Sequence, residues 1–206
     1  ATVLRRQPDA DGVAGLVDRG LSGSQRMGRM IEDLLDVTRI RHAGGLALQL
    51  GRADMQSIVQ RTLDEGQTSF PDRNIESVLQ GDMAGVWDSE RLCQVATNIV
   101  GNAIHHGAPD QPVRVAVDGT QASVVTVAVS NGGTIAPELL PHLFDPFRGR
   151  DRAPGRHQGL GLGLFIAHQV VRAHGGRIDV HSQDGTTRFV VELPRVSPAA
   201  EKWSNT

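Results

Sequence analysis

The hydrophobic pattern between residues 46 and 194 changes period several times, which limits the chain to a fold that contains both helices and strands. Segments whose apolar residues recur every three or four positions predict helices, and segments that alternate apolar with polar residues predict strands. This order predicts an α/β layer in which helices cover one face of a mixed sheet. Strands are expected over 46–50 and 74–81, in two runs within 113–133 on either side of Gly119, and in a terminal hairpin of 177–182 and 187–194 around Asp184 and Gly185, with helices over 53–67, 88–107 and 164–174.

The first 41 residues follow a helical pattern without strands. Pro8 separates residues 1–7, which have the pattern of a last helical turn, from an amphipathic helix within 13–41. A single helix cannot bury its apolar stripe alone, so a helical hairpin with its first helix mostly missing is predicted, in a chain that is itself a piece of a longer protein. The expected division is a hairpin over 1–43, a domain over 44–196 that starts at the hinge glycines Gly44 and Gly45, and a loose tail over 197–206; the stripe comprises Met27, Met30, Ile31, Leu34, Leu35 and Thr38.

Composition excludes several classes of function. The formal net charge of −2 gives no bulk reason to expect nucleic acid, an acidic lipid surface or a strongly charged substrate as a partner. No apolar run approaches the roughly 20 residues that span a bilayer, and residues 1–12 lack the apolar core of a signal peptide. Cys93 is the only cysteine and cannot form an internal disulfide, so a cytoplasmic location is expected for this part, whether the longer protein is membrane-anchored or soluble.

Residues 88–107 predict a two-faced helix that begins at Asp88 and ends at Gly107. Asn98, Asn102 and His105 fall within a narrow arc of this helix. Asparagine is a poor residue for a helix interior, so two on one face favour a ligand there, although a solvated polar face is the alternative for the spacing alone. Amide oxygens are neutral ligands that suit Mg²⁺ when phosphates share it. The opposite, core-facing stripe is expected to comprise Leu92, Val95, Ala96, Ile99, Val100 and Ala103.

Residues 159–164 alternate three glycines with three leucines and lead into a predicted helix. They do not form a dinucleotide fingerprint, because Leu164 stands where a glycine is required, and no lysine follows to make a P-loop. Free N–H groups and the helix dipole favour anions at such a terminus, and glycines let phosphates approach closely, but a tight turn explains the glycines equally well. The preceding segment predicts a polar loop able to close over a nucleotide; its arginines are Arg148, Arg150, Arg152 and Arg156.

Five short motifs, in order, resemble those of bacterial sensor histidine kinases, whose ATP-binding domain shares the Bergerat fold with certain chaperone, topoisomerase and mismatch-repair ATPases. The resemblance covers nearly the whole chain down to Pro194, because residues 26–41 are similar to the second helix of the family's dimerisation domain. It implies an α+β fold, a Bergerat-type α/β sandwich, preceded by a fragment of a dimeric four-helix bundle. The motifs are NIVGNAIHHG (98–107) for the N box, SNGGTIAPELL (130–140) for the first glycine box, LFDPF (143–147) for the F box, GLGLGL (159–164) for the second glycine box and DGTTRFVVELP (184–194) for the last.

The resemblance implies ATP and Mg²⁺ as cofactors. Asn98 and Asn102 would serve Mg²⁺ and the phosphates, and His105 occupies the place of a common phosphate-contacting lysine, beside His106. A histidine changes its charge near neutral pH, so phosphate affinity is expected to depend on pH, unless the two histidines only close the helix end. Further nucleotide contacts are implied for Gly133, Arg156, Gly159, Leu160, Gly161, Leu162, Gly163, Leu164 and Thr187.

The first glycine box departs from the family pattern, in which an aspartate accepts a hydrogen bond from the adenine amino group. Asn131 takes that position if the family's Asp-x-Gly is aligned with Asn131, Gly132 and Gly133. Ser130 takes it if the motif is aligned backward from Ile135. Asn131 is preferred, because its side-chain carbonyl can accept the same hydrogen bond, although without a carboxylate's charge. Weaker adenine binding is therefore expected.

The reaction implied is that of a protein-histidine kinase, which passes the γ-phosphoryl group of ATP to a histidine on the first dimerisation helix and then to a response-regulator receiver domain. No histidine precedes His42, so no catalytic residue is assigned and the acceptor is expected upstream. Asn98 stands where ATPase relatives have a water-activating glutamate, which argues against a dedicated ATPase. A homodimer through the hairpin is expected, and the alternative function is a non-catalytic dimeric scaffold with a degenerate nucleotide site.

Overall fold

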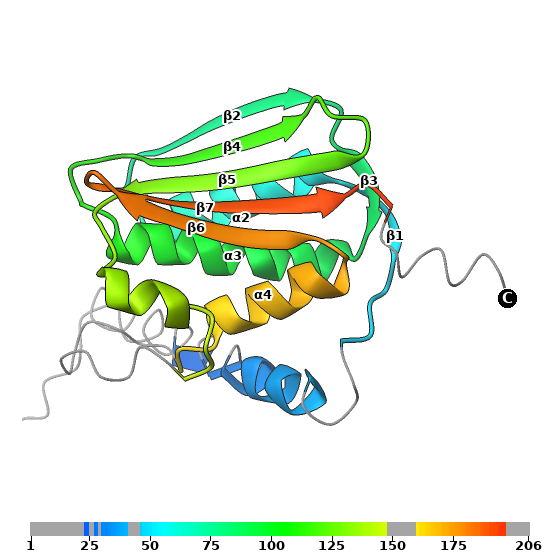
Figure 1. The fold of residues 1–206 in the computed structure, drawn as a ribbon, viewed down its shortest axis with the longest axis horizontal. Helices are drawn as coiled ribbons and strands as arrows, with labels where there is room; N and C mark the ends of the chain where they lie inside the picture. Colours follow the sequence, from blue (N-terminus) through cyan, green and yellow to red (C-terminus); the bar gives the residue numbers. More distant parts are fainter. Residues whose placement is uncertain (1–22, 25–26, 29, 41–45, 148–159, 197–206) are drawn as a thin grey trace, which may run out of the picture.

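The computed structural model describes residues 23–24, 27–28, 30–40, 46–147 and 160–196 (Figure 1). Its main sheet has five strands: β2 (Ile75–Gly81), β4 (Val113–Gly119), β5 (Val124–Gly132), β6 (Arg177–Gln183) and β7 (Thr186–Pro194). Their spatial order is β2-β4-β5-β7-β6. β2 runs parallel to β4, and every other neighbouring pair is antiparallel. The sheet is therefore mixed, as predicted.

Three helices cover one face of this sheet, which confirms the predicted layer (Figure 1). They are α2 (Met55–Ser69), α3 (Ser89–His106) and α4 (Gly163–Ala173). Inward-facing valines of β4 and β5 pack against the apolar stripes of the helices to form one core. The predicted stripe of α3 is buried except Ala96, which is half-buried. The predicted caps of α3 are also present: the Asp88 side chain accepts the Arg91 N–H, and Gly107 is the C-cap.

A second, two-stranded sheet pairs β1 (Gly51–Asp54) with β3 (Ala84–Trp87). The predicted strand over 46–50 is wrong, since these residues form no strand and β1 begins only at Gly51. The leucines of 46–50 are half-buried, which explains the alternating pattern. The Gln49 N–H, however, donates to the Asp88 carboxylate at 2.8 Å instead of to a neighbouring strand. An extended segment that is buried on one side therefore has the same alternating sequence pattern as a strand, although it pairs with none.

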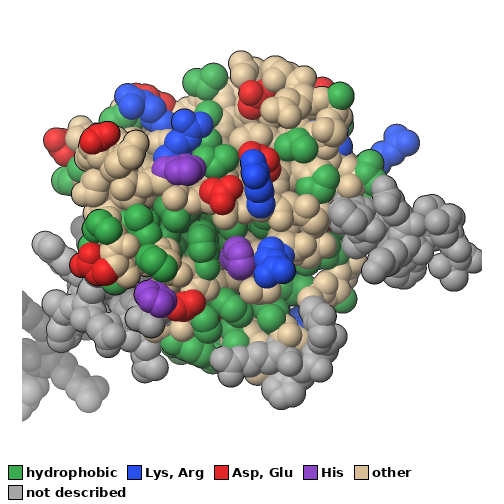
Figure 2. Space-filling view, viewed as in Figure 1, with side chains coloured by type: hydrophobic (Ala, Val, Ile, Leu, Met, Phe, Trp, Pro, Cys, Tyr) green, Lys and Arg blue, Asp and Glu red, His purple; other side chains and the backbone are tan. Residues whose placement is uncertain are grey.

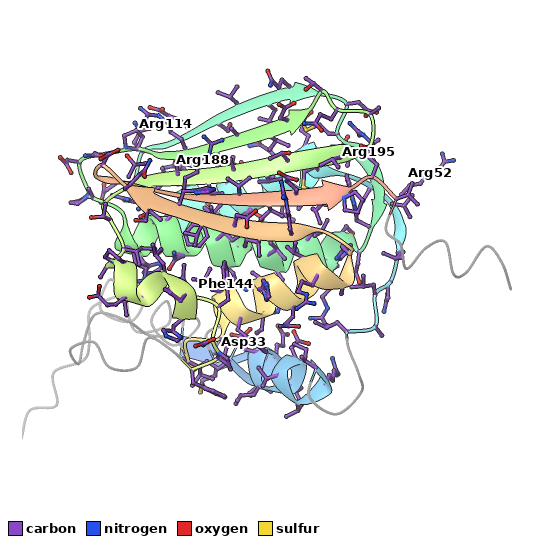
Figure 3. All side chains as sticks on the ribbon, in the orientation of Figure 1. Asp33, Arg52, Arg114, Phe144, Arg188 and Arg195 are labelled. Atoms are coloured by element: carbon purple, nitrogen blue, oxygen red, sulfur yellow. The ribbon has the colours of Figure 1, made fainter. Side chains whose placement is uncertain are left out.

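The hairpin of β6 and β7 turns at Asp184 and Gly185, as predicted. Both residues have positive φ, 50° and 74°, which defines a two-residue type I′ turn. At the other end of β7, the Arg195 guanidinium donates to the carbonyls of four residues (Figure 3). These carbonyls belong to Asp82, Ala84, Gly119 and Gln121. Arg195 thereby ties the end of the sheet to two neighbouring loops.

Residues 30–40 are helical and pack against α3. Asp36, which is buried, forms an ion pair with Arg91 and also accepts a hydrogen bond from Gln94 at 3.1 Å. Val37 is buried beside it and joins the core. The predicted stripe faces away from the domain, and Figure 2 shows hydrophobic side chains at the surface in the lower part of the molecule, where this helix lies. Exposed fractions on the stripe are 60% for Met27, 58% for Ile31, 44% for Leu34 and 48% for Leu35.

The helices in the described ranges are all too short or too polar to cross a membrane.

Candidate functional site

The polar face of α3 carries the predicted ligands toward its C-terminal end. Asn98 and Asn102 are half-buried, one turn apart, and His105 and His106 are exposed in the last turn. The His105 ring nitrogen Nδ1 lies 2.6 Å from the Gly101 carbonyl oxygen, to which it can donate. The His105 ring also contacts the Phe70 ring edge-on, with centroids 5.1 Å apart. The His105 ring is therefore held both by its own helix and by the end of α2.

Asn98 meets the glycine run at the start of α4. Its Oδ1 atom lies 2.9 Å, and its Cγ atom 3.1 Å, from the position that a Cβ on Gly163 would occupy. Any side chain at position 163 would therefore displace the asparagine. The Nδ2 atom of Asn98 is buried and has no hydrogen-bond partner among the described residues. A buried amide without a partner is destabilising, so the structure holds an unmet polar group where the two predicted motifs touch.

The glycine run forms the N-terminus of α4. Leu162 is the N-cap residue, and no side chain caps the first turn. Gly161 has φ +68°, a left-handed conformation that favours glycine, and its carbonyl accepts the Phe147 N–H at 3.1 Å. Leu162 is buried, and Leu160 and Leu164 are half-buried against the core. The leucines thus pack inward, whereas Gly161 and Gly163, which are half-buried, add no side chain over the backbone.

The end of β5 forms a third part of the site. Gly133 has φ +108°, its N–H donates to the Gly185 carbonyl at 2.8 Å, and its carbonyl accepts the Thr187 hydroxyl at 2.8 Å. The Ser182 hydroxyl lies 2.9 Å from the Thr187 hydroxyl and accepts the Ile135 N–H at 2.7 Å. These bonds join the first and last predicted boxes. Ser182 was not predicted, because a half-buried serine in an alternating strand pattern gives no signal for such a role.

Asn131 and Ser130, the alternatives for the adenine contact, lie on opposite faces of β5. Asn131 is 5% exposed and pairs across the sheet with Thr187. Ser130 pairs with Arg114 and Arg188, which are exposed on the outer face (Figure 3). Since side chains alternate along a strand, Asn131 belongs to the face that the helices cover.

The F box packs on α4 through Phe144, whose ring stacks on His168 with centroids 5.1 Å apart (Figure 3). Burial, and to a smaller extent the nearby Arg172 charge, lower the pKa of His168, which favours the neutral form of this ring beside Phe144. Phe147 has φ +65°, an uncommon left-handed conformation for a residue other than glycine. The F box is therefore linked to α4 by this stack and to the glycine run by the Phe147–Gly161 hydrogen bond.

The structure brings three of the predicted elements together: the α3 face, the end of β5 and the start of α4. The predicted contacts Arg156 and Gly159 lie outside the described residues. No cluster of three histidine, cysteine, aspartate or glutamate side chains that could hold a metal occurs within the described ranges.

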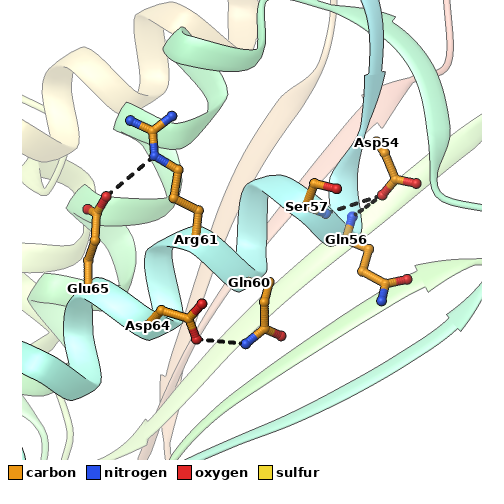
Figure 4. Close-up of a pocket in the computed structure, with 7 residues that line it drawn as sticks. All are labelled: Asp54, Gln56, Ser57, Gln60, Arg61, Asp64 and Glu65. Atoms are coloured by element: carbon orange, nitrogen blue, oxygen red, sulfur yellow. Dashed lines mark hydrogen bonds and ion pairs between the residues drawn. The ribbon is translucent and has the colours of Figure 1, made fainter.

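An open depression of about 520 Å³ lies along α2, away from this site (Figure 4). Its polar groups already bond to one another: Gln60 donates to Asp64 at 2.8 Å, and Arg61 pairs with Glu65 at 3.4 Å. It is a solvated helix face and shares no residue with the predicted site. The lining residues are Asp54, Gln56, Ser57, Gln60, Arg61, Asp64 and Glu65.

Comparison with known proteins identifies the domain. Residues 87–197, more than half of the chain, match the family described as histidine kinase-, DNA gyrase B- and HSP90-like ATPases. The chain is 32% identical over 174 residues to a bacteriophytochrome of Pseudomonas aeruginosa, a match that covers 84% of this chain and 24% of the relative. It is 31% identical over 179 residues to the sensor protein SrrB of Staphylococcus aureus, covering 85% of this chain and 30% of the relative.

Among solved structures, a mycobacterial sensor histidine kinase, MprB, matches with a TM-score of 0.62 and 25% identity, over 71% of this chain and 98% of that one. The chain spans less than a third of the length of the two curated relatives. The matching region includes all three parts of the site. The chain therefore belongs to the family of histidine kinase-, DNA gyrase B- and HSP90-like ATPases, and it is an ATP-binding catalytic domain of the sensor histidine kinase type.

Proposed function

We propose that this domain binds Mg-ATP and presents its γ-phosphoryl group to a histidine outside these 206 residues, from which the group passes to an aspartate of a response-regulator receiver domain. The observation that carries this proposal is the contact of Asn98 with Gly163. It joins an unpartnered, buried amide to an uncapped helix N-terminus, and both groups suit a metal-bound phosphate.

The residues present fit Mg²⁺. Asn98 and Asn102 offer two neutral amide oxygens from one helix face, and Gly163 leaves space beside the first of them. A magnesium ion keeps several waters and is usually held by few protein groups together with phosphates. When bound, it would neutralise part of the phosphate charge. The N–H groups of the first turn of α4 and the His105 ring would contact the remaining phosphate oxygens.

The adenine ring of the nucleotide would lie against the end of β5. Asn131 supports this role better than Ser130, because Asn131 lies on the helix-covered face with Gly133 and Thr187. We assign the adenine amino group to the Asn131 side-chain oxygen, as an acceptor without charge. Gly133 has no Cβ, and its left-handed backbone lets the chain turn away beneath the base.

In the proposed reaction the bond between the γ-phosphorus and the β,γ-bridging oxygen breaks, a bond to the histidine nitrogen forms, and ADP leaves. The domain contributes by holding the nucleotide in position and by balancing its charge, which are the main sources of catalysis in phosphoryl transfer. Asn98 replaces the acidic group that would activate water, so hydrolysis is disfavoured relative to transfer. We further propose that the working unit is a cytoplasmic homodimer assembled through the helix that contains residues 30–40.

Titration calorimetry with Mg-ATP tests the nucleotide site. Asn102→Ala is expected to weaken binding at least about tenfold, since loss of a group at a metal site typically costs 10–100-fold in affinity. It should also reduce the difference between titrations with and without Mg²⁺. Thr97→Ala, at an exposed position of the same helix, is the matched control and should leave both values unchanged.

Unchanged affinity and unchanged Mg²⁺ dependence in Asn102→Ala would refute the metal assignment. Absence of binding to the parent chain at millimolar nucleotide would instead favour the non-catalytic dimeric scaffold. In the longer protein, labelled phosphate from [γ-³²P]ATP on a histidine would identify the transfer reaction itself.

A further inference from the structure

Arg73, in the loop between α2 and β2, ends inside the protein beside the proposed base site. Its Nη1 atom donates to the Ala108 carbonyl at 2.9 Å. Its Nε and Nη2 atoms are buried and have no acceptor among the described residues. Arg73 Nη2 and Asn131 Cβ each lie 3.0 Å from the position that a Cβ on Gly107 would take. The guanidinium group and Asn131 are therefore neighbours at the end of α3.

A short series of hydrogen bonds leads from Arg73 to the Asn131 side chain. The Ala108 N–H donates to the Gly132 carbonyl at 3.0 Å. The same carbonyl accepts Asn131 Nδ2 at 2.9 Å. Arg73 holds the carbonyl side of Ala108, and Ala108 holds the acceptor that orients the asparagine. No described residue donates a hydrogen bond to Asn131 Oδ1.

The orientation of this amide follows from chemistry and not from atom labels, which alone do not distinguish the oxygen from the nitrogen. A carbonyl oxygen can only accept, so the amide NH₂ must face Gly132 and the oxygen must face away. An asparagine can otherwise read either an amino group or a carbonyl group. Here its donor is already engaged, which leaves only an acceptor for a ligand.

We propose that Arg73 is a positioning residue that makes Asn131 selective for a purine bearing an amino group at ring position 6, such as ATP, over one bearing a carbonyl group there, such as GTP. The inference rests on the proposed nucleotide site and adds how its base is chosen. An aspartate would need no such arrangement, because both carboxylate oxygens accept.

Packing alone does not account for an arginine at this position. Two donor atoms of a buried charged group without partners reduce stability, whereas a methionine of similar length would fill the space without them. The useful contribution of Arg73 is thus its hydrogen bond to Ala108, which supports the carbonyl that orients Asn131.

A double-mutant cycle with Mg-ATP and Mg-GTP titrations on this chain tests the proposal. Arg73→Met is expected to lower the ATP-to-GTP affinity ratio about tenfold, because the Asn131 amide is then free to turn and donate to a carbonyl. In an Asn131→Asp background the same substitution should leave the ratio unchanged. Arg114→Met, on the outer face of β4, is the control and should change neither ratio (Figure 3).

Equal changes of the ratio in the two backgrounds would show a general structural role and overturn the proposal, as would no change in either. If Arg73→Met does not fold, Ala108→Pro removes the N–H that bonds to Gly132 and should lower the ratio in the same way. ATP binding with an unchanged ratio refutes only this inference. Failure of the parent chain to bind either nucleotide refutes the proposed function as well.

Discussion

At the scale of single residues, Gly163 sets how closely α4 can approach Asn98. A Cβ at this position would lie 2.9 Å from Asn98 Oδ1, inside normal contact distance. The end of the asparagine side chain can move aside, so the fold should tolerate a methyl group there. The position of the Asn98 amide should change, however, because the amide can occupy its present place only while residue 163 has no Cβ.

Gly163→Ala is therefore expected to keep the fold and to weaken Mg-ATP binding about tenfold, which corresponds to roughly 1.4 kcal/mol. Calorimetric affinity together with the thermal midpoint measures both effects. Gly66→Ala in α2 is the control: its added methyl group would meet only Ile75 and Ile104 at 3.6 Å, an ordinary contact. An affinity for Gly163→Ala equal to that of the control would mean that Asn98 does not contact the ligand.

At the scale of elements, the buried histidine His174 joins α4 to α3. Its Nδ1 atom donates to the Val170 carbonyl at 2.8 Å, and its Nε2 atom accepts the Asp88 N–H at 3.0 Å. The second bond requires the neutral ring, because a protonated Nε2 cannot accept, whereas Nδ1 can donate from either form. Burial lowers the pKa of His174, against smaller opposing effects of the Val170 carbonyl and the Asp88 charge.

The His174 ring binds a proton less readily in the folded protein than in the unfolded chain. Its contribution to the free energy of unfolding should therefore be greatest above the ordinary histidine pKa of about 6.5. It should fall as the pH drops from there through the lowered folded pKa. Urea unfolding between pH 7.5 and 5 measures this slope, to which His168 contributes with the same sign. The free energy of unfolding of His174→Gln should depend less on pH than that of the parent chain. His181→Gln, at an exposed position, should show the same pH dependence as the parent. Equal slopes for all three proteins would contradict the assignment.

The elements themselves were largely predictable from the sequence. Asp88 and Gly107 mark the ends of α3 by local capping chemistry, and the Asp184–Gly185 turn is a local preference for positive φ. The false strand over 46–50 and the missed β3 have one cause, since strand pairing is decided by distant backbone partners. In the site, spacing predicted Asn98 and Asn102, but the role of Arg73 depends on a contact across 35 residues that no local pattern encodes.

At the scale of the whole molecule, the helix containing residues 30–40 has two faces, and among the described residues only one of them is packed against the domain. Asp36 pairs with Arg91 of α3 and Val37 is buried in the core, while the stripe of Ile31, Leu34 and Leu35 remains exposed. The spacing of the stripe, four and then three residues from Met27, is that of a helix–helix seam. The helix can therefore hold its own catalytic domain and a second copy of the chain at the same time.

Light scattering after size exclusion should give the mass of a dimer for the parent chain and of a monomer for Leu34→Glu, because a charge in a buried seam opposes association. Glu32→Ala, an exposed position of the same helix, should remain dimeric. A dimer that survives Leu34→Glu would place the interface elsewhere. Calorimetry on the monomeric variant should still show nucleotide binding, because the proposed site lies within one chain.

The hydrogen bond between the Phe147 N–H and the Gly161 carbonyl has a consequence for how such a domain can diversify. It brings together two residues that are 14 positions apart in the sequence, so the departure and return points of the intervening chain are fixed. Doubling the length of a chain between fixed ends costs only about 0.6 kcal/mol. A longer or altered sequence between these two residues should therefore leave the F box and the start of α4 in place.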